Sequence, residues 1–181
     1  NHLENNVKFT NWNCLFSKMI SSTREVKLRW FQYRVMHRIL TTNTYLFKLK
    51  YIENDLCTFC QNDPETITHL LWDCQFTQLF WKDFSMWLKD CPHVCNMNLS
   101  LELILFGGKE NFVTDNIFDF ILLFAKFFIY KCKCQNSKPQ FKRFSNEISV
   151  RYKIEKDIAS SNCTADKFYQ SWMLYHSLFS T

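Results

Sequence analysis

Four residues between positions 57 and 74 have the types and the spacing of a metal site, Cys57-x2-Cys60-x8-His69-x4-Cys74. Thiolate and imidazole ligands suit zinc, which takes a tetrahedral Cys3His set and then has no open position for water. The Cys57-x2-Cys60 pair is typical of a knuckle, in which two thiolates approach the metal from one turn. We therefore predict one zinc with a structural role. The alternative is a set of unrelated buried cysteines beside a surface histidine.

The second half of this motif has to leave the regular helical path. On an ideal α-helix, His69 and Cys74 would project about 140° apart. The helix that carries them should therefore end or kink near Asp73, so that both side chains can reach the same ion.

The remaining cysteines favour reduced thiols over a disulfide framework. Nine cysteines is an odd number, and residues 1–10 are polar and lack the apolar core of an export signal. Free thiols and metal ligation fit this pattern. A second, looser cluster, Cys91, His93 and Cys95, has no fourth ligand near it in the sequence, so whether it binds another metal stays open.

The elements that must position these ligands are helices. The chain of 181 residues contains 19 Phe, 6 Trp and 7 Tyr but only 2 Gly and 3 Pro, which favours long helices with aromatic cores. The fold class expected is mainly α, a multi-helix domain with an irregular zinc knuckle at 51–63 inserted between helices. A capping box at Ser22–Glu25 predicts the first helix. The helices expected are 23–40, 42–49, one restarting at Asp63-Pro64 and continuing through a further helix to Leu88, 116–134, 140–160 and 166–179.

Composition and charge divide the chain into three predicted parts. Residues 1–20 form a polar linker or cut edge, 21–90 a basic helix with the zinc-binding domain, and 91–181 a helical extension. The apolar run 117–130 contains Asp119 and Lys126. At 14 residues it is too short to span a bilayer and predicts a buried helix, not a membrane anchor.

The net charge of +5 combines two basic arms with an acidic middle. Residues 1–56 hold 9 Lys or Arg against 4 Asp or Glu, 57–115 hold 3 against 8, and 116–181 hold 10 against 5. On a helix, Lys27, Arg34 and Arg38 would fall within about 40° of one another. Polyanion binding or ordinary solvated charge would both fit this pattern. The candidate contacts are, in the first arm, Arg24, Lys27, Arg34 and Arg38, and around the turn at Pro139, Lys131, Lys133, Lys138, Lys142 and Arg143.

The aromatic residues of the first helix have two interpretations. Helical spacing favours burial of Trp30 and Tyr33 in the core. Phe31 and Tyr33 are alternatively available for stacking on bases.

Several stretches of the sequence resemble segments of one known family of proteins. The run from Leu28 to Arg34, then Ile39-Leu40-Thr41-Thr42, and then the Cys/Cys/His/Cys spacing with a trailing Trp81 look like the zinc-binding domain that follows the polymerase in LINE elements. Later matches resemble the C-terminal region of LINE-1-type second open reading frame proteins. These are Ile104–Gly107, Phe124–Lys126, Lys138-Pro139, Tyr152–Lys156 and Trp172.

This resemblance implies a nucleic-acid-binding module, with RNA as its expected ligand, that supports target-primed reverse transcription. The implied partners are the RNA of the element or the target DNA, and the polymerase part of the same polypeptide. The implied location is the cytoplasm and nucleus, as a ribonucleoprotein. The alternative is a zinc-stabilised scaffold that packs on the polymerase or another protein and binds no RNA.

Catalysis by this stretch of chain is not expected. Reverse transcription needs paired aspartates that hold two metal ions, and the sequence has no Asp-Asp pair. A ribonuclease H site would need carboxylates gathered on strands, whose alternating pattern is missing. There is no Gly-rich phosphate loop either.

Overall fold

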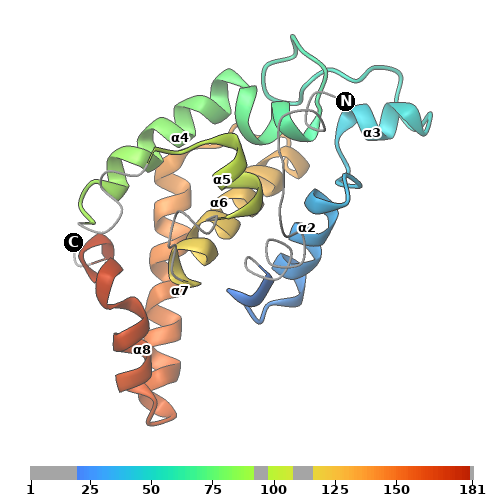
Figure 1. Cartoon of the computed structure of the whole chain (residues 1–181). Coiled ribbons are helices and arrows are strands. Elements are labelled where there is room, and N and C mark those ends of the chain that lie inside the picture. The colour runs from blue at the N-terminus through green and yellow to red at the C-terminus, as the bar shows by residue number, and fades with distance from the viewer. Residues whose placement is uncertain (1–19, 92–97, 108–115, 180–181) are drawn as a thin grey trace.

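The computed structural model describes residues 20–91, 98–107 and 116–179, and within them the regular elements are helices (Figure 1). No strand occurs in this part of the chain; two residues, Leu56 and Pro64, form an isolated antiparallel bridge. The prediction of a mainly α fold with an irregular segment between helices is confirmed. The elements are α2 (Val26–Met36), α3 (Asn43–Lys48), the π-helical turn η1 (His69–Asp73), α4 (Gln75–Leu88), α5 (Leu101–Phe106), α6 (Asn116–Cys134), α7 (Phe141–Ser161), α8 (Ala165–Trp172) and the 3-10 helix η2 (Met173–Phe179).

Helix α6 forms the centre of the molecule, as its apolar run predicted. It packs against α2, η1, α5 and α7, and its side chains from Phe118 to Tyr130 are buried with the exception of the half-buried Phe127. None of the described helices is both long and apolar enough to cross a bilayer. Elements on both sides of residue 90 contribute to this core. The division of the chain into domains at residues 20 and 90 stays a prediction.

The core around α6 is built from aromatic rings that meet edge-to-face or offset. Phe80 of α4 lies 5.9 Å from Phe128 of α6 and 5.4 Å from Phe144 of α7, measured between ring centroids. Phe84 lies 5.7 Å from Phe144. These separations fall in the range in which aromatic pairs attract beyond the burial of their area. Three helices are thus held together by one aromatic cluster.

A buried lysine on α6 joins two further helices. The Lys126 ammonium donates hydrogen bonds to Gln32 Oε1 of α2 at 2.6 Å and to the Leu105 carbonyl of α5 at 3.2 Å. Gln32 Nε2 donates to the same carbonyl at 2.9 Å. Both side chains are fully or almost fully buried, so this network fixes how α2 and α5 sit on α6.

Helix α2 is shorter at both ends than the sequence predicted. The capping box does not form: the helix begins after Glu25, whose amide donates to Thr23 Oγ1 at 3.1 Å instead. The helix ends at Met36, and Arg38 has a φ of 58°. Continuing the helix would place Leu40 about 120° away from Leu28 around the axis. Ending it early lets Leu40 turn into the core, where it is fully buried.

The prediction that a helix restarts at Asp63-Pro64 was also wrong. Pro64 forms the bridge to Leu56, and helical residues begin at Ile67. At the start of this helix, the Thr66 hydroxyl accepts a hydrogen bond from the His69 amide at 3.0 Å. The pairing across the knuckle therefore extends past the proline before the helix starts.

Other boundaries lie close to their predictions. Helix α3 lies within the predicted range 42–49, and Thr42 caps it by accepting a hydrogen bond from the Tyr45 amide. Helix α7 is displaced by one residue from its prediction, and the last predicted helix is divided into α8 and η2. The six-residue α5, capped by Ser100, was not predicted. Helix α5 ends at Gly107, whose φ of 80° favours glycine.

The burial of Lys126 predicts a specific dependence of stability on pH. Loss of hydration lowers its pKa from 10.5 to about 7, partly offset by the charge of Asp119. Between these values the unfolded chain binds a proton that the folded protein lacks, so the free energy of unfolding rises with pH. We expect wild type to gain about 2 kcal/mol over Lys126→Met between about pH 7 and pH 9, measured by urea denaturation. Equal pH slopes for the two proteins would contradict a depressed pKa.

Candidate metal centre

The first two ligands come from a tight turn in the irregular segment. Residues 58–60 form a turn closed by a hydrogen bond from the Gln61 amide to the Cys57 carbonyl, 2.9 Å, and Gln61 has a φ of 59°. The Phe59 amide donates to Cys57 Sγ at 3.4 Å. Amides that point at a sulfur favour its thiolate form, which is the form that binds metal. The knuckle predicted from Cys57-x2-Cys60 is confirmed.

The other two ligands flank a π-helical turn, which is the departure from α-helical geometry that their spacing required. The Cys74 amide donates to the His69 carbonyl at 2.9 Å, an i to i+5 hydrogen bond. Such a bond places residue 74 roughly one turn beyond residue 69, on the same side. The backbone then turns at Cys74, where ψ is 131°. The kink expected near Asp73 is therefore present.

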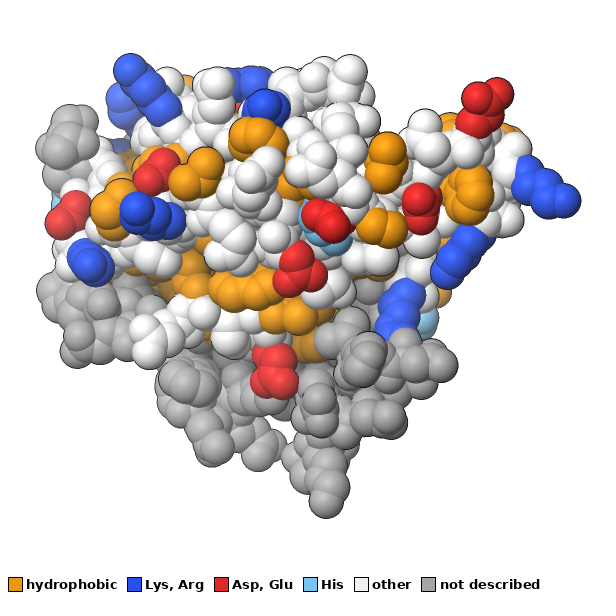
Figure 2. Space-filling model, turned by 90° about the horizontal axis from the view of Figure 1, so that it is seen from above, with side chains coloured by type: hydrophobic (Ala, Val, Ile, Leu, Met, Phe, Trp, Pro, Cys, Tyr) orange, Lys and Arg blue, Asp and Glu red, His pale blue; other side chains and the backbone are white. Residues whose placement is uncertain are grey.

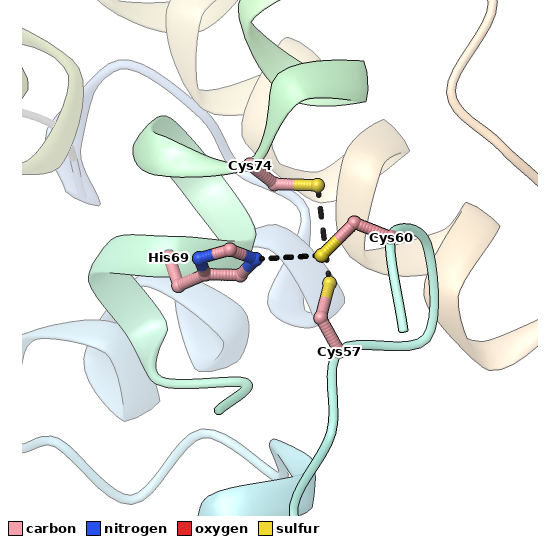
Figure 3. A group of neighbouring side chains, drawn as sticks. All are labelled: Cys57, Cys60, His69 and Cys74. Atoms are coloured by element: carbon pink, nitrogen blue, oxygen red, sulfur yellow. Dashed lines mark hydrogen bonds between the residues drawn. The ribbon is translucent and has the colours of Figure 1, made fainter. Parts of the chain in front are cut away.

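Together the four side chains converge on one point (Figure 3). Their ligand atoms all lie within 4.8 Å of one another. Cys57 Sγ is 3.9 Å from Cys74 Sγ, and Cys60 Sγ is 3.3 Å from His69 Nε2. With zinc–sulfur bonds of about 2.3 Å, tetrahedral geometry would separate two sulfurs by about 3.8 Å. The donor set and these separations fit one structural zinc.

Two of the ligand thiols, Cys57 and Cys74, lie within hydrogen-bonding distance of each other, with 3.9 Å between their sulfur atoms. The Cys57 thiol donates to the Cys74 sulfur, which raises the pKa of Cys57 and lowers the pKa of Cys74 to about 5. The amides of Phe76 and Thr77, at the start of α4, lower the pKa of Cys74 further. A helix N-terminus favours negative charge for the same reason. The lowered pKa favours the thiolate form of Cys74, which is the form that binds metal.

A buried glutamate supports the site from outside its ligand shell. Glu65 is fully buried. One of its carboxylate oxygens accepts from the Asn43 amide at 2.9 Å, and the other accepts from the Thr58 amide at 2.7 Å, inside the knuckle. The ammonium of Lys133 lies 3.5 Å from the first oxygen. This carboxylate therefore connects the start of α3, the metal turn and the end of α6.

The second, looser cluster lies largely outside the described residues. Cys91 is described and buried, whereas His93 and Cys95 fall in the range 92–97. Within the described part of the chain, the group of possible metal ligands that the structure brings together is the one at residues 57–74.

The predicted basic face of α2 is only partly formed. Arg38 lies beyond the end of the helix, so it does not share a face with Lys27 and Arg34 as predicted. Lys27 is exposed and 3.5 Å from Glu25. The guanidinium of Arg34 lies over the Tyr130 ring at 5.6 Å. Arg24 and Arg38 are exposed.

The second predicted patch is also divided by the fold. Lys133 was expected at the surface, but its side chain is only 10% exposed, and it binds Glu65 and the Thr41 carbonyl. Its burial follows from the need of the Glu65 charge for a counterion. Lys131 forms an ion pair with Glu147 at 3.0 Å. The cations of this patch that the structure leaves exposed are Lys138, over the Phe76 ring at 3.8 Å, Lys142 and Arg143.

Sequence reasoning missed Glu65, Gln32 and Lys126 as structural centres. Glu65 precedes the helix that carries His69, but nothing in its neighbours marks it as buried. The burial of Lys126 does have a signal in the sequence, because apolar residues flank it on both sides.

Comparison with known proteins agrees with this geometry. Residues 2–81 match the model of a family described as zinc-binding in reverse transcriptase. The match includes all four cluster residues and α2, and it covers less than half of the chain, ending within α4. No curated protein and no solved structure matches the chain. This part of the chain is thus similar to a zinc-binding, non-catalytic module of reverse transcriptases.

Removal of one ligand tests the site directly. We expect Cys60→Ser to lose zinc and to loosen residues 50–90, because the ligands converge only in the folded state. Elemental analysis and limited proteolysis measure the two effects. The exposed Cys163, replaced by serine, is the matched control and should keep both metal and protease resistance. Well-folded wild-type protein without metal would contradict the assignment.

Replacement of Glu65 tests the support of the site. Glu65→Ala leaves the Lys133 charge buried and removes the acceptor of two amides, so we expect a loss of about 3–5 kcal/mol in the free energy of unfolding. Chelator competition should also show weaker zinc binding, because the Thr58 amide is no longer held. Glu53→Ala, an exposed residue of the same segment, serves as the control. Equal stability of the two variants would rule out this role of Glu65.

Proposed function

We propose that this chain is a nucleic-acid-binding module of a LINE-type retrotransposon reverse transcriptase, placed C-terminal to the polymerase, with RNA as its expected ligand. The observation that carries the proposal is that residues 2–81 match a reverse-transcriptase zinc-binding family while their four ligands converge on one point. The module would hold RNA of the element or target DNA during target-primed reverse transcription. It would act beside the polymerase part of the same polypeptide, in a ribonucleoprotein of the cytoplasm and nucleus.

The chemistry of the site supports binding over catalysis. A Cys3His set fills the coordination sphere of zinc, so no position is left for an attacking water. The zinc would hold the knuckle and α4 against the core. The fragment itself is proposed to have no polymerase or nuclease activity.

The distribution of charge supports a polyanionic partner. In Figure 2, Lys and Arg side chains lie mainly toward the two ends of this face, and Asp and Glu side chains are scattered over its ends and its middle. Along the sequence, residues 1–56 and 116–181 are basic and residues 57–115 are acidic. A strand of nucleic acid would therefore contact the basic side chains at the ends of this face.

The experiment that tests binding measures the anisotropy of labelled single-stranded RNA and DNA against increasing salt. A logarithm of affinity that falls linearly with the logarithm of salt concentration would report phosphate contacts. Competition between the two oligonucleotides would report their relative affinity. Absence of salt-dependent binding to either one would overturn the proposal.

An alternative function is that of a scaffold for the polymerase or another protein. An apolar groove of about 900 Å³ lies between α2, α6 and α7. It is lined by Phe127 and by a row on α7, Val150, Ile154 and Ile158, whose residues are more than half exposed. An exposed apolar row of this kind is suited to contact with another protein. A chain that binds no nucleic acid but binds the polymerase part would favour this function.

Charge reversal identifies which arm contacts phosphate. Arg24→Glu combined with Arg38→Glu changes two exposed cations without touching the core. We expect RNA affinity to fall at least about tenfold at moderate salt, and the slope of log affinity against log salt to flatten by about two units. The matched pair is Lys138→Glu with Lys142→Glu, also exposed. If the first pair has no effect and the second abolishes binding, the contacts lie on the other arm.

A further inference from the structure

Helix α2 carries a stacked pair of aromatic rings, of which Trp30 is exposed and Tyr33 is half-buried. Trp30 is 56% exposed, although helical spacing favoured its burial. Its ring lies parallel to that of Tyr33, with centroids 5.1 Å apart and an interplanar angle of 5°. Tyr33 in turn lies 4.1 Å from the His37 ring. The three residues, spaced by three and four positions, form a continuous aromatic row along the helix.

This row lies opposite the buried face of α2. The residues that enter the core are Leu28, Phe31, Gln32 and Val35. Measured at about 100° per residue from Leu28, Trp30, Tyr33 and His37 project between about 140° and 200°. The full burial of Phe31 excludes it as a stacking residue. The core therefore does not explain the aromatic row.

Cations flank the row on both sides. Arg29 projects at about 100° from Leu28, on one side of the row, and Arg34 and Lys27 project at about 240° to 260°, on the other. The helix contains no acidic residue. Glu25, which precedes the helix, is paired with Lys27 and with Arg151 of α7. The surface around the indole is therefore positive.

We propose that Trp30, supported by Tyr33, is a stacking platform for an unpaired base of single-stranded nucleic acid. This inference deepens the proposed function and rests on it. A parallel ring fixes the indole in a defined plane, so less conformational freedom is lost when a base stacks on it. Base–aromatic stacking tolerates any sequence, because every base has a π face, and flanking cations contact the backbone. Duplex DNA or RNA does not offer its base faces, so the platform selects single strands.

The test compares an intact single-stranded oligonucleotide with the same oligonucleotide carrying abasic residues, by fluorescence anisotropy, in RNA and DNA forms. Wild type should bind the intact oligonucleotide at least about fivefold more tightly than the abasic one. Trp30→Ala should remove this difference, and it should leave the salt slope unchanged because no phosphate contact is lost. Trp30→Tyr should restore most of it.

The matched control is Tyr169→Ala, which removes an exposed aromatic ring from α8, a helix that lies within residues 116–181. It should bind both oligonucleotides as wild type does. If wild type binds intact and abasic oligonucleotides equally well, with the usual salt dependence, the platform is wrong while the proposed function stands. If no nucleic acid binds at all, both are wrong. Comparing oligonucleotides on wild type also keeps the test valid if Trp30→Ala fails to fold.

Discussion

The packing around the metal centre depends on a buried carboxylate, that of Glu65. A carboxylate removed from water is costly unless each oxygen is hydrogen-bonded and the charge is paired. Here two backbone amides and the Lys133 ammonium meet these needs, from Asn43, Thr58 and the end of α6. Asn43 and Thr58 lie 22 and 7 positions before Glu65, whereas Lys133 lies 68 positions after it. Their common partner places the knuckle on the helical body.

Helix α6 also contributes Lys126 to a second buried polar network, with Gln32 and the Leu105 carbonyl. This changes how the positive charge of residues 116–181 should be interpreted. Lys126 and Lys133 of α6 both point inward, toward Gln32 and Glu65 respectively. Lys131 is paired with Glu147. A count of Lys and Arg along 116–181 therefore overstates the positive surface of this arm. Of the cations of α2, Lys27 and Arg29 are exposed, whereas Arg34 lies over the Tyr130 ring.

Sequence patterns predicted the features that depend on local periodicity or on ligand chemistry. The four ligands follow from their types and spacing, and the buried α6 follows from its apolar run. The ends of α2 and the start of the helix before His69 could not be predicted, because a distant core position for Leu40 and a bridge to Leu56 outweigh local capping signals. The position of Lys133 was unpredictable for the same reason, since its partner lies 68 positions earlier in the chain.

The irregular segment explains why a metal is needed at this position. Between α3 and η1 the chain has little regular hydrogen bonding, and of its side chains Cys57, Phe59 and Glu65 are buried. So small an apolar contribution cannot offset the conformational entropy of ordering the segment. Zinc bonds to four side chains would supply the missing free energy. They would also join the knuckle to Cys74, and through Cys74 to α4, whose Phe80 and Phe84 enter the aromatic core. Metal binding would thus be coupled to the packing of the helical body through Cys74, in addition to the contact that Glu65 makes with Lys133.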